Sequence, residues 1–171
     1  MTKELENIFL NALEEHQHKL LRICSVYAKD NDDSKDLYQE VLVNIWKSLP
    51  SFKGNSNIGT WMYRITLNVC LRLKTKEIKK QNKLLRLDGQ AINIHKTFDS
   101  EDGQNVQREQ LMQLRECIKR LNEADKAVIT LYLEELPYKE ISNITGLNEN
   151  TIAAKIKRIK DKLLNCLKPI S

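Results

Sequence analysis

Among the side chains of this 171-residue chain that could do chemistry, two carboxylates come first. Asp36 and Glu40 are four residues apart and therefore project from one face of a helix. Such a pair could act as general acid and base or bind a metal ion, but no nucleophile or facing acid pair accompanies it. A solvated helix face is its common role. The sharper hypothesis is an acidic docking surface that includes Gln39 and Val43.

A second candidate group lies between residues 55 and 72, where aromatic, amide and arginine side chains alternate. This mixture suits single-stranded or partly melted nucleic acid, because bases stack on rings while arginines hold phosphates. Trp61 and Tyr63 could equally be core aromatics. The candidate residues here are Asn55, Ser56, Trp61, Tyr63, Arg64, Leu67, Asn68 and Arg72.

The stretch from 137 to 163 has the pattern of a helix-turn-helix. Pro137 suits the first turn of a helix, where a missing N–H costs nothing. Gly146 can adopt the left-handed conformation that closes this helix, and Asn148 is a good N-cap for the next. The second helix should bury one stripe, formed by Ile152, Ile156, Ile159 and Leu163.

The outward faces of that second helix carry small, amide and basic residues. Small and amide side chains near a helix N-terminus can reach base edges in the major groove, and basic side chains can bind phosphates. Two short helices around a glycine also occur in ordinary bundles, where such lysines are incidental. The candidate contacts to duplex DNA are Tyr138, Asn148, Asn150, Thr151, Ala153, Ala154, Lys155, Lys157 and Arg158.

Composition favours an all-α fold. Hydrophobic residues make up 41% of the chain and charged residues 30%, while only 5 glycines and 3 prolines are available to make hairpin turns. The net charge is +5, and it is unevenly distributed: residues 72–86 hold seven Lys or Arg against one acid. No signal peptide or bilayer-long apolar run is present, so we expect a cytoplasmic protein without membrane insertion.

The four cysteines and two nearby histidines give no sign of a metal site. The cysteines are far apart without paired spacing, so we expect buried free thiols. His16 and His18 fall on different helix faces, and no fourth ligand accompanies them and Cys24. We expect neither a metal nor any other cofactor. The four cysteines are Cys24, Cys70, Cys117 and Cys166.

Helical periodicity predicts two small helical domains joined by a flexible linker. Three helices are expected in residues 1–87, over roughly 5–27, 35–49 and from 58 past 73. Residues 88–107 lack periodicity and form the predicted linker. Residues 108–171 should contain two helices, the second capped by Asn122, followed by the helix-turn-helix.

Taken together, these stretches resemble the extracytoplasmic-function (ECF) sigma factors, the two-domain members of the sigma-70 family of RNA polymerase sigma factors. In the first domain the resemblance rests on Asp33, Asp36, Leu37, Gln39, Glu40, Val41, Trp46, Phe52, Gly54, Thr60, Trp61, Met62, Tyr63, Ile65 and Asn68. In the second it rests on Leu121, Tyr132, Leu136, Tyr138, Glu140, Ile141, Gly146, Leu147, Thr151, Ile152, Lys155, Arg158 and Leu163.

The resemblance implies a role for each part of the chain. The helix bearing Asp36 and Glu40 would bind the clamp helices of the polymerase beta-prime subunit, and the beta subunit is a further implied contact. Residues 52–72 would recognise and open the minus-10 promoter element, and the helix-turn-helix would read the minus-35 element. The linker would thread toward the RNA exit path. An anti-sigma partner is expected by family analogy alone.

The sequence departs from the family pattern at several positions. Ile58 stands where phenylalanine is usual, and Ala153 and Ala154 replace lysine and serine or threonine. Outward alanine methyls could contact thymine, and Asn150 could pair with adenine, so these departures bear on promoter sequence.

The sequence therefore predicts a non-enzymatic specificity subunit that directs core RNA polymerase to promoters and initiates transcription. One rival is a stand-alone helix-turn-helix regulator of duplex operators, which leaves the acidic helix and the Trp61 region without a role. A metal-dependent nucleic-acid enzyme using Asp36 and Glu40 is a second rival, and it requires acidic ligands facing that pair.

Overall fold

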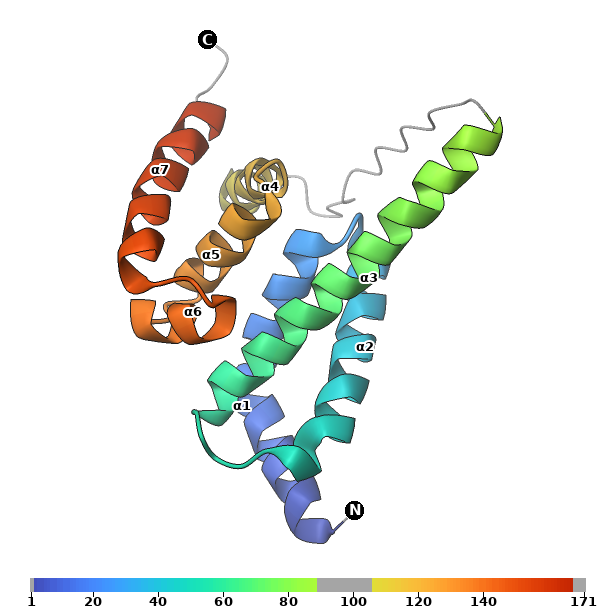
Figure 1. Cartoon of the computed structure of the whole chain (residues 1–171), viewed down its shortest axis with the longest axis vertical. Helices are drawn as coiled ribbons and strands as arrows, with labels where there is room; N and C mark the ends of the chain where they lie inside the picture. Colours follow the sequence, from blue (N-terminus) through green and yellow to red (C-terminus); the bar gives the residue numbers. More distant parts are fainter. Residues whose placement is uncertain (1, 89–105, 168–171) are drawn as a thin grey trace. The chain divides into compact units, whose positions relative to one another are not determined.

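The computed structural model describes residues 2–88 and 106–167, with side chains described for 2–77 and 106–167. The chain divides into two compact units, residues 1–98 and 99–171. All the longer elements in the described ranges are α-helices, in agreement with the predicted fold class (Figure 1). The predicted linker, 88–107, lies almost entirely outside the described residues. None of the helices in the described ranges has the length and apolar character needed to span a membrane.

The described part of unit 1, residues 2–88, is a bundle of three helices. They are α1 (Lys3–Tyr27), α2 (Asn31–Ser48) and α3 (Ile58–Asp88), with a short 3-10 turn, η1 (Leu49–Ser51), after α2 (Figure 1). Each helix contributes to one core, whose fully buried side chains include Leu20, Ile23, Val41, Ile45 and Met62. The apolar residues whose helical spacing predicted the three helices are therefore the residues that form this core.

The connection between α1 and α2 is shorter than the sequence suggested. The Asp30 carboxylate accepts a hydrogen bond from the Asp33 backbone N–H at 2.8 Å, so α2 begins at Asn31 rather than near Lys35. Asp33 in turn forms an ion pair with Lys74 of α3, whose ammonium also lies 2.8 Å from Glu77. This cluster of charges holds the start of α2 against the middle of α3.

Unit 2, where its residues 106–167 are described, has four helices around a second core. They are α4 (Val106–Lys119), α5 (Glu123–Leu133), α6 (Tyr138–Thr145) and α7 (Glu149–Leu167). Asn122 caps α5 as predicted, because its side-chain oxygen accepts from the Asp125 N–H at 2.8 Å. The core combines the predicted stripe of α7 with residues of α5 and α6, among them Val128, Leu131, Ile141, Ile152, Ile156 and Ile159.

The predicted helix-turn-helix is formed by α6 and α7. Gly146 has a φ of +81°, and its N–H donates to the Ser142 carbonyl at 2.8 Å, which closes α6. The Asn148 side chain then accepts from the Thr151 N–H at 2.8 Å and caps α7. Pro137 is the N-cap of α6 rather than a residue of its first turn. Pro137, Gly146 and Asn148 therefore predicted the start and end of α6 and the start of α7 to within one residue.

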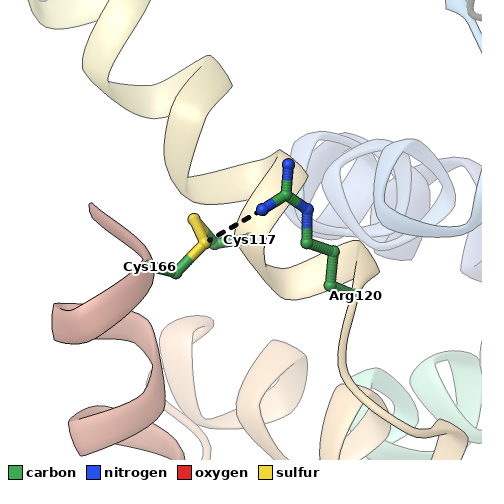
Figure 2. Close-up of a disulfide and its surroundings, with 3 residues drawn as sticks. All are labelled: Cys117, Arg120 and Cys166. Carbon is green, nitrogen blue, oxygen red and sulfur yellow. Dashed lines mark hydrogen bonds between the residues drawn. A yellow bond between two sulfur atoms is a disulfide. The ribbon is translucent and has the colours of Figure 1, made fainter. Parts of the chain in front are cut away.

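The prediction of four free thiols is wrong for one pair of cysteines. Cys117 near the end of α4 and Cys166 near the end of α7 form a disulfide (Figure 2). Cys24 and Cys70 are buried free thiols, as predicted. The two bonded residues are 49 positions apart, so their proximity depends on the packing of α4 along α7. Sequence spacing carries no signal of that packing.

Candidate nucleic-acid interface

The four predicted docking residues share the outer face of α2. Their positions follow the helical pattern i, i+3, i+4, i+7, and all four are exposed, while Leu37, Val41 and Ile45 on the opposite face are buried. Val43 is 46% exposed among polar neighbours. An apolar side chain set within a polar rim is the usual composition of a protein-docking surface. These four residues, Asp36, Gln39, Glu40 and Val43, form the acidic face of α2.

The loop before α3 is organised by short polar contacts and one aromatic pair. Asn57 accepts a hydrogen bond from the Gly59 N–H at 2.7 Å and so begins α3. Asn55 is exposed and Ser56 is half-buried in this loop. Phe52 lies against Trp61, with ring centroids 4.9 Å apart, so the indole is partly covered and the residue is only half-exposed.

A line of polar and aromatic side chains continues from Trp61 along α3. Residues 61, 64, 68 and 72 recur at i, i+3, i+7 and i+11, which is one face of a helix. Asn68 and Arg72 are exposed, and Arg64 is half-buried. This α3 stripe, formed by Trp61, Arg64, Asn68 and Arg72, can offer a ring to an unpaired base and cations to its phosphates.

Two of the predicted DNA contacts on α3 are corrected by the structure. Tyr63 is 3% exposed and Leu67 is 4% exposed, so neither can touch DNA while unit 1 is folded. Thr60 and Thr66 beside them are also buried. The reason is that both α1 and α2 cover α3, which buries a wider arc than a single stripe. Tyr63 and Leu67 support the α3 stripe from behind.

His16 of α1 holds the beginning of α3 in place. Its Nδ1 atom is hydrogen-bonded to the Tyr63 hydroxyl at 2.8 Å. A Cβ at position 59 would lie 2.6 Å from His16 Cε1, so only glycine admits the ring this closely. Sequence reasoning considered His16 only as a metal ligand and missed this role. The unusual Gly59 was the available signal of a close approach.

Burial lowers the pKa of His16 from its ordinary value of 6.5; Glu15 acts to raise that pKa and Lys19 to lower it. A histidine whose pKa is depressed in the folded state binds fewer protons there than when unfolded. We therefore expect unit 1 to lose stability as the pH falls below about 6.5 and to keep this contribution above it.

This pH dependence is measurable because both tryptophans, Trp46 and Trp61, lie in unit 1. Denaturant unfolding followed by their fluorescence at pH 7.5 and 5.5 should show the loss. His16→Gln should flatten the dependence in this range, whereas replacing the exposed His18 should leave it as in the wild type. An equal slope in all three chains would contradict the role of His16.

The recognition helix α7 exposes most of the residues predicted to contact duplex DNA. Asn150, Ala153, Ala154, Lys157 and Arg158 are exposed, and Thr151 is half-buried. The side chain of Asn148 is partly used in capping α7, and Tyr138 at the start of α6 is exposed. The arrangement combines amide and methyl groups near the helix N-terminus with cations beyond them, which suits insertion into a major groove.

Lys155 differs from its neighbours because its ammonium is already engaged. It lies 3.0 Å from a carboxylate oxygen of Asp125 in α5, a side chain that is only 8% exposed. Lys162 lies 3.7 Å from the other oxygen of the same carboxylate. A phosphate contact by Lys155 would require its ammonium to leave Asp125. The sequence analysis did not identify Asp125, because its partner Lys155 lies 30 residues away.

Replacing Lys155 by methionine should therefore lower the free energy of unfolding of unit 2 by about 1–3 kcal/mol, since a nearly buried carboxylate loses its best partner. Circular dichroism during denaturation measures this, with tryptophan fluorescence reporting unit 1 separately. Asp125→Asn should lessen the effect of Lys155→Met, because the two changes remove the same contact. Strictly additive losses would show that the contact contributes nothing.

The fold and these surfaces define a class of protein. One helical unit carries a helix-turn-helix whose recognition helix is basic and exposed. The other carries an aromatic and basic stripe on α3 and an acidic face on α2. This is a two-unit helix-turn-helix protein of the kind that binds DNA. Within the described residues, no group of three or more His, Cys, Asp or Glu is placed to hold a metal ion.

Comparison with known families assigns both units. Sigma-70 region 2 matches residues 12–80, and sigma-70 region 4 matches residues 111–163. The two regions occur in this order over most of the chain, and the chain belongs to the sigma-70 family, in its ECF group. It is an RNA polymerase sigma factor, and its partners are core RNA polymerase and promoter DNA.

Individual relatives are distant but cover nearly the whole chain. An RNA polymerase sigma factor SigV from Bacillus subtilis is 25% identical over 88% of this chain and 86% of its own length. An ECF RNA polymerase sigma-E factor from Haemophilus influenzae is 26% identical over 91% of this chain and 85% of its own length.

Two solved structures share the fold. The sigma factor RpoE from Bartonella quintana, solved with the anti-sigma factor NepR, has a TM-score of 0.71 at 20% identity, covering 99% of this chain and 100% of its own. CnrH, solved with the cytosolic domain of CnrY, has a TM-score of 0.70 at 18% identity, covering 97% and 91%.

Proposed function

We propose that residues 1–87 dock on core RNA polymerase through the acidic face of α2. The clamp helices of the beta-prime subunit are the proposed contact for Asp36, Gln39, Glu40 and Val43. Support comes from the exposure of all four side chains on one helix face, with Val43 as an apolar centre. Charged groups around such a centre can direct encounter and orientation, while the apolar contact adds affinity.

The same unit opens the minus-10 element with the α3 stripe and the loop before it. Trp61, half-covered by Phe52, presents the remaining part of its ring to an unpaired base. Arg64, Asn68 and Arg72 continue along one face and can follow the phosphates of the separated strand. Asn55 and Ser56 lie in the loop that precedes α3, at the N-terminal end of this stripe.

Residues 108–171 read the minus-35 element through α7. The observation that carries this assignment is the exposed face that includes Asn150, Ala153, Lys157 and Arg158, backed by the buried isoleucine stripe. Tyr138, Asn148, Thr151 and Ala154 border that face. Lys155 joins it only after exchanging Asp125 for a phosphate.

Two substitutions on α7 test the minus-35 assignment. Asn150→Ala should cost about 1–3 kcal/mol and relax the preference at one base position. Lys157→Ala should weaken all upstream sequences alike and reduce the salt slope of binding by about one. Both effects are measured as the binding of each variant to a set of promoter variants. The parent promoters are those that the chain with core polymerase selects from a random library. Identical sequence profiles for the two variants would mean that the groove-facing side is misassigned.

Further properties follow from the family and stand as proposals. The chain has no catalytic activity of its own, acts in the cytoplasm, touches the beta subunit as well as beta-prime, and is restrained by an anti-sigma factor. The solved relatives bound to NepR and to CnrY support the last point. Residues 88–107 are the proposed linker toward the RNA exit path. Co-purification with core RNA polymerase tests the central claim.

A further inference from the structure

We propose that Cys117 and Cys166 form a reversible thiol–disulfide site, oxidised by a peroxide or a low-molecular-weight disulfide, that sets the thermal stability of the helix-turn-helix unit. The proposal rests on the cytoplasmic function proposed above. In a reducing compartment disulfides are rare, and those that occur are mostly transient or redox-sensing. We therefore do not expect a permanent disulfide in the cytoplasm.

The positions of Cys117 and Cys166 allow a disulfide between them to crosslink most of unit 2. The two Cα atoms are 6.0 Å apart, within the range that a disulfide requires. The bond joins the last turns of α4 and α7 and closes a loop that contains α5, α6 and nearly all of α7. Nearly all of the helix-turn-helix therefore lies within the crosslinked segment. Figure 2 shows the two bonded sulfur atoms between α4 and α7.

The two sulfurs are unequal in access and in charge environment. Cys166 is exposed, whereas Cys117 is buried at 7% exposure. Arg120 places its Nη1 atom 3.8 Å from the Cys166 sulfur (Figure 2). A guanidinium beside a cysteine favours the thiolate, which is the reactive form. Cys166 is thus the sulfur that meets an oxidant first, and Cys117 is the sulfur that completes the bond.

The chemistry balances with a peroxide as the oxidant. The Cys166 thiolate attacks one peroxide oxygen, the O–O bond breaks, and the products are a sulfenic acid on Cys166 and water after proton uptake. The Cys117 sulfur then attacks the sulfenic sulfur, its proton and the hydroxyl group leave as a second water, and the S–S bond forms. Two thiols are oxidised and one hydrogen peroxide is reduced to two waters. Reduced glutathione reverses the bond by thiol–disulfide exchange.

The other cysteine pair provides an internal contrast. Cys24 and Cys70 are fully buried in unit 1, and the hydrogen bond to Cys70 together with burial raises the pKa of Cys24 far above its usual range. Both sulfurs lie in the core of unit 1, out of reach of solvent, so the oxidants that act on Cys166 should leave them unchanged.

Oxidation should raise the thermal stability of unit 2. At the end of α7, Leu164 and Asn165 are exposed, and Leu163 is the buried residue beside them. A crosslink across 49 residues reduces the conformational freedom of the unfolded unit. The reduced unit 2 should therefore melt roughly 10–20 °C below the oxidised unit. Unit 1 should melt at the same temperature in both forms.

The experiment compares the full chain after treatment with reduced glutathione, oxidised glutathione or hydrogen peroxide. Mass-tagging of thiols with peptide mapping should locate the bond at Cys117 and Cys166 only. Calorimetry should show the shift of unit 2, with the fluorescence of Trp46 and Trp61 as the control for unit 1. Cys166→Ser should melt like the reduced form under all conditions, and the matched exposed change Asn165→Ser should behave as wild type. Arg120→Gln should slow oxidation at pH 7 about 3–10-fold.

Three results would overturn the proposal. A bond that survives an excess of reduced glutathione is a permanent crosslink. A pair that stays reduced with oxidised glutathione and peroxide is not a redox site. Equal melting of the two forms removes the consequence for stability. None of these measurements contains DNA or polymerase, so a failure of the proposed promoter function would appear separately, in the co-purification.

Discussion

Reversing the charge of Asp36 and Glu40 together, to lysine, should abolish binding to core RNA polymerase while unit 1 stays folded. Both side chains are exposed on α2, so their replacement disturbs no core contact. At a docked interface, reversed charges meet like charges and cost several kcal/mol. A loss of about 4 kcal/mol corresponds to roughly a thousandfold weaker affinity.

The measurement is a pull-down with purified core enzyme, backed by fluorescence of the unit 1 tryptophans to confirm folding. Glu4→Lys with Glu14→Lys is the matched control, because it changes the net charge equally on exposed positions of α1. That control should retain most of the affinity. If the α2 variant is folded and binds core enzyme as the wild type does, the acidic face has another role.

Promoter opening should require the chain and core polymerase together. The free chain should bind promoter duplex weakly and with little selectivity, because each unit offers few base contacts. A flexible linker, as the sequence predicts for residues 88–107, would add little effective concentration. Opening DNA costs about 1.4 kcal/mol per base-pair step in lost stacking. The α3 stripe, with one half-covered ring at Trp61, cannot supply that for several steps. Core enzyme would fix the spacing of the units and hold the separated strand.

Gel shift and permanganate footprinting measure this difference. With core enzyme, thymines near the minus-10 element should become reactive and the complex should resist dilution. Core enzyme alone, on the same selected promoter, is the control and should leave these thymines protected. Tight, sequence-specific duplex binding by the free chain, unchanged by core enzyme, would instead support the stand-alone regulator.

Local patterns predicted the local structure well. In unit 2, the spacing of Ile152, Ile156 and Ile159 identified the buried face of α7, and Gly146 with Asn148 identified the turn. These features depend on helical periodicity and on turn and cap chemistry, which are properties of neighbouring residues. The acidic face of α2 was equally accessible, because Asp36 and Glu40 project from a helix with one clear apolar stripe.

Features that depend on packing between distant segments could not be predicted. Periodicity does not say how many neighbours cover a helix. Leu67 was therefore predicted to contact DNA, and Tyr63 could not be assigned to the core rather than to DNA, on a helix that is covered by two others. The Cys117–Cys166 bond and the contact of Asp125 with Lys155 each join residues that the sequence leaves far apart. Their partners are chosen by the tertiary fold.

The contact between Asp125 and Lys155 bears on any attempt to redesign the promoter preference of this chain. Grafting α7 alone into another scaffold would release the Lys155 ammonium wherever the host lacks an acid at the matching place, and would add phosphate affinity that favours no sequence. The reverse graft would leave the nearly buried carboxylate of Asp125 without its closest cation. The transferable module for specificity is therefore discontinuous: it comprises the recognition helix together with the first turn of α5.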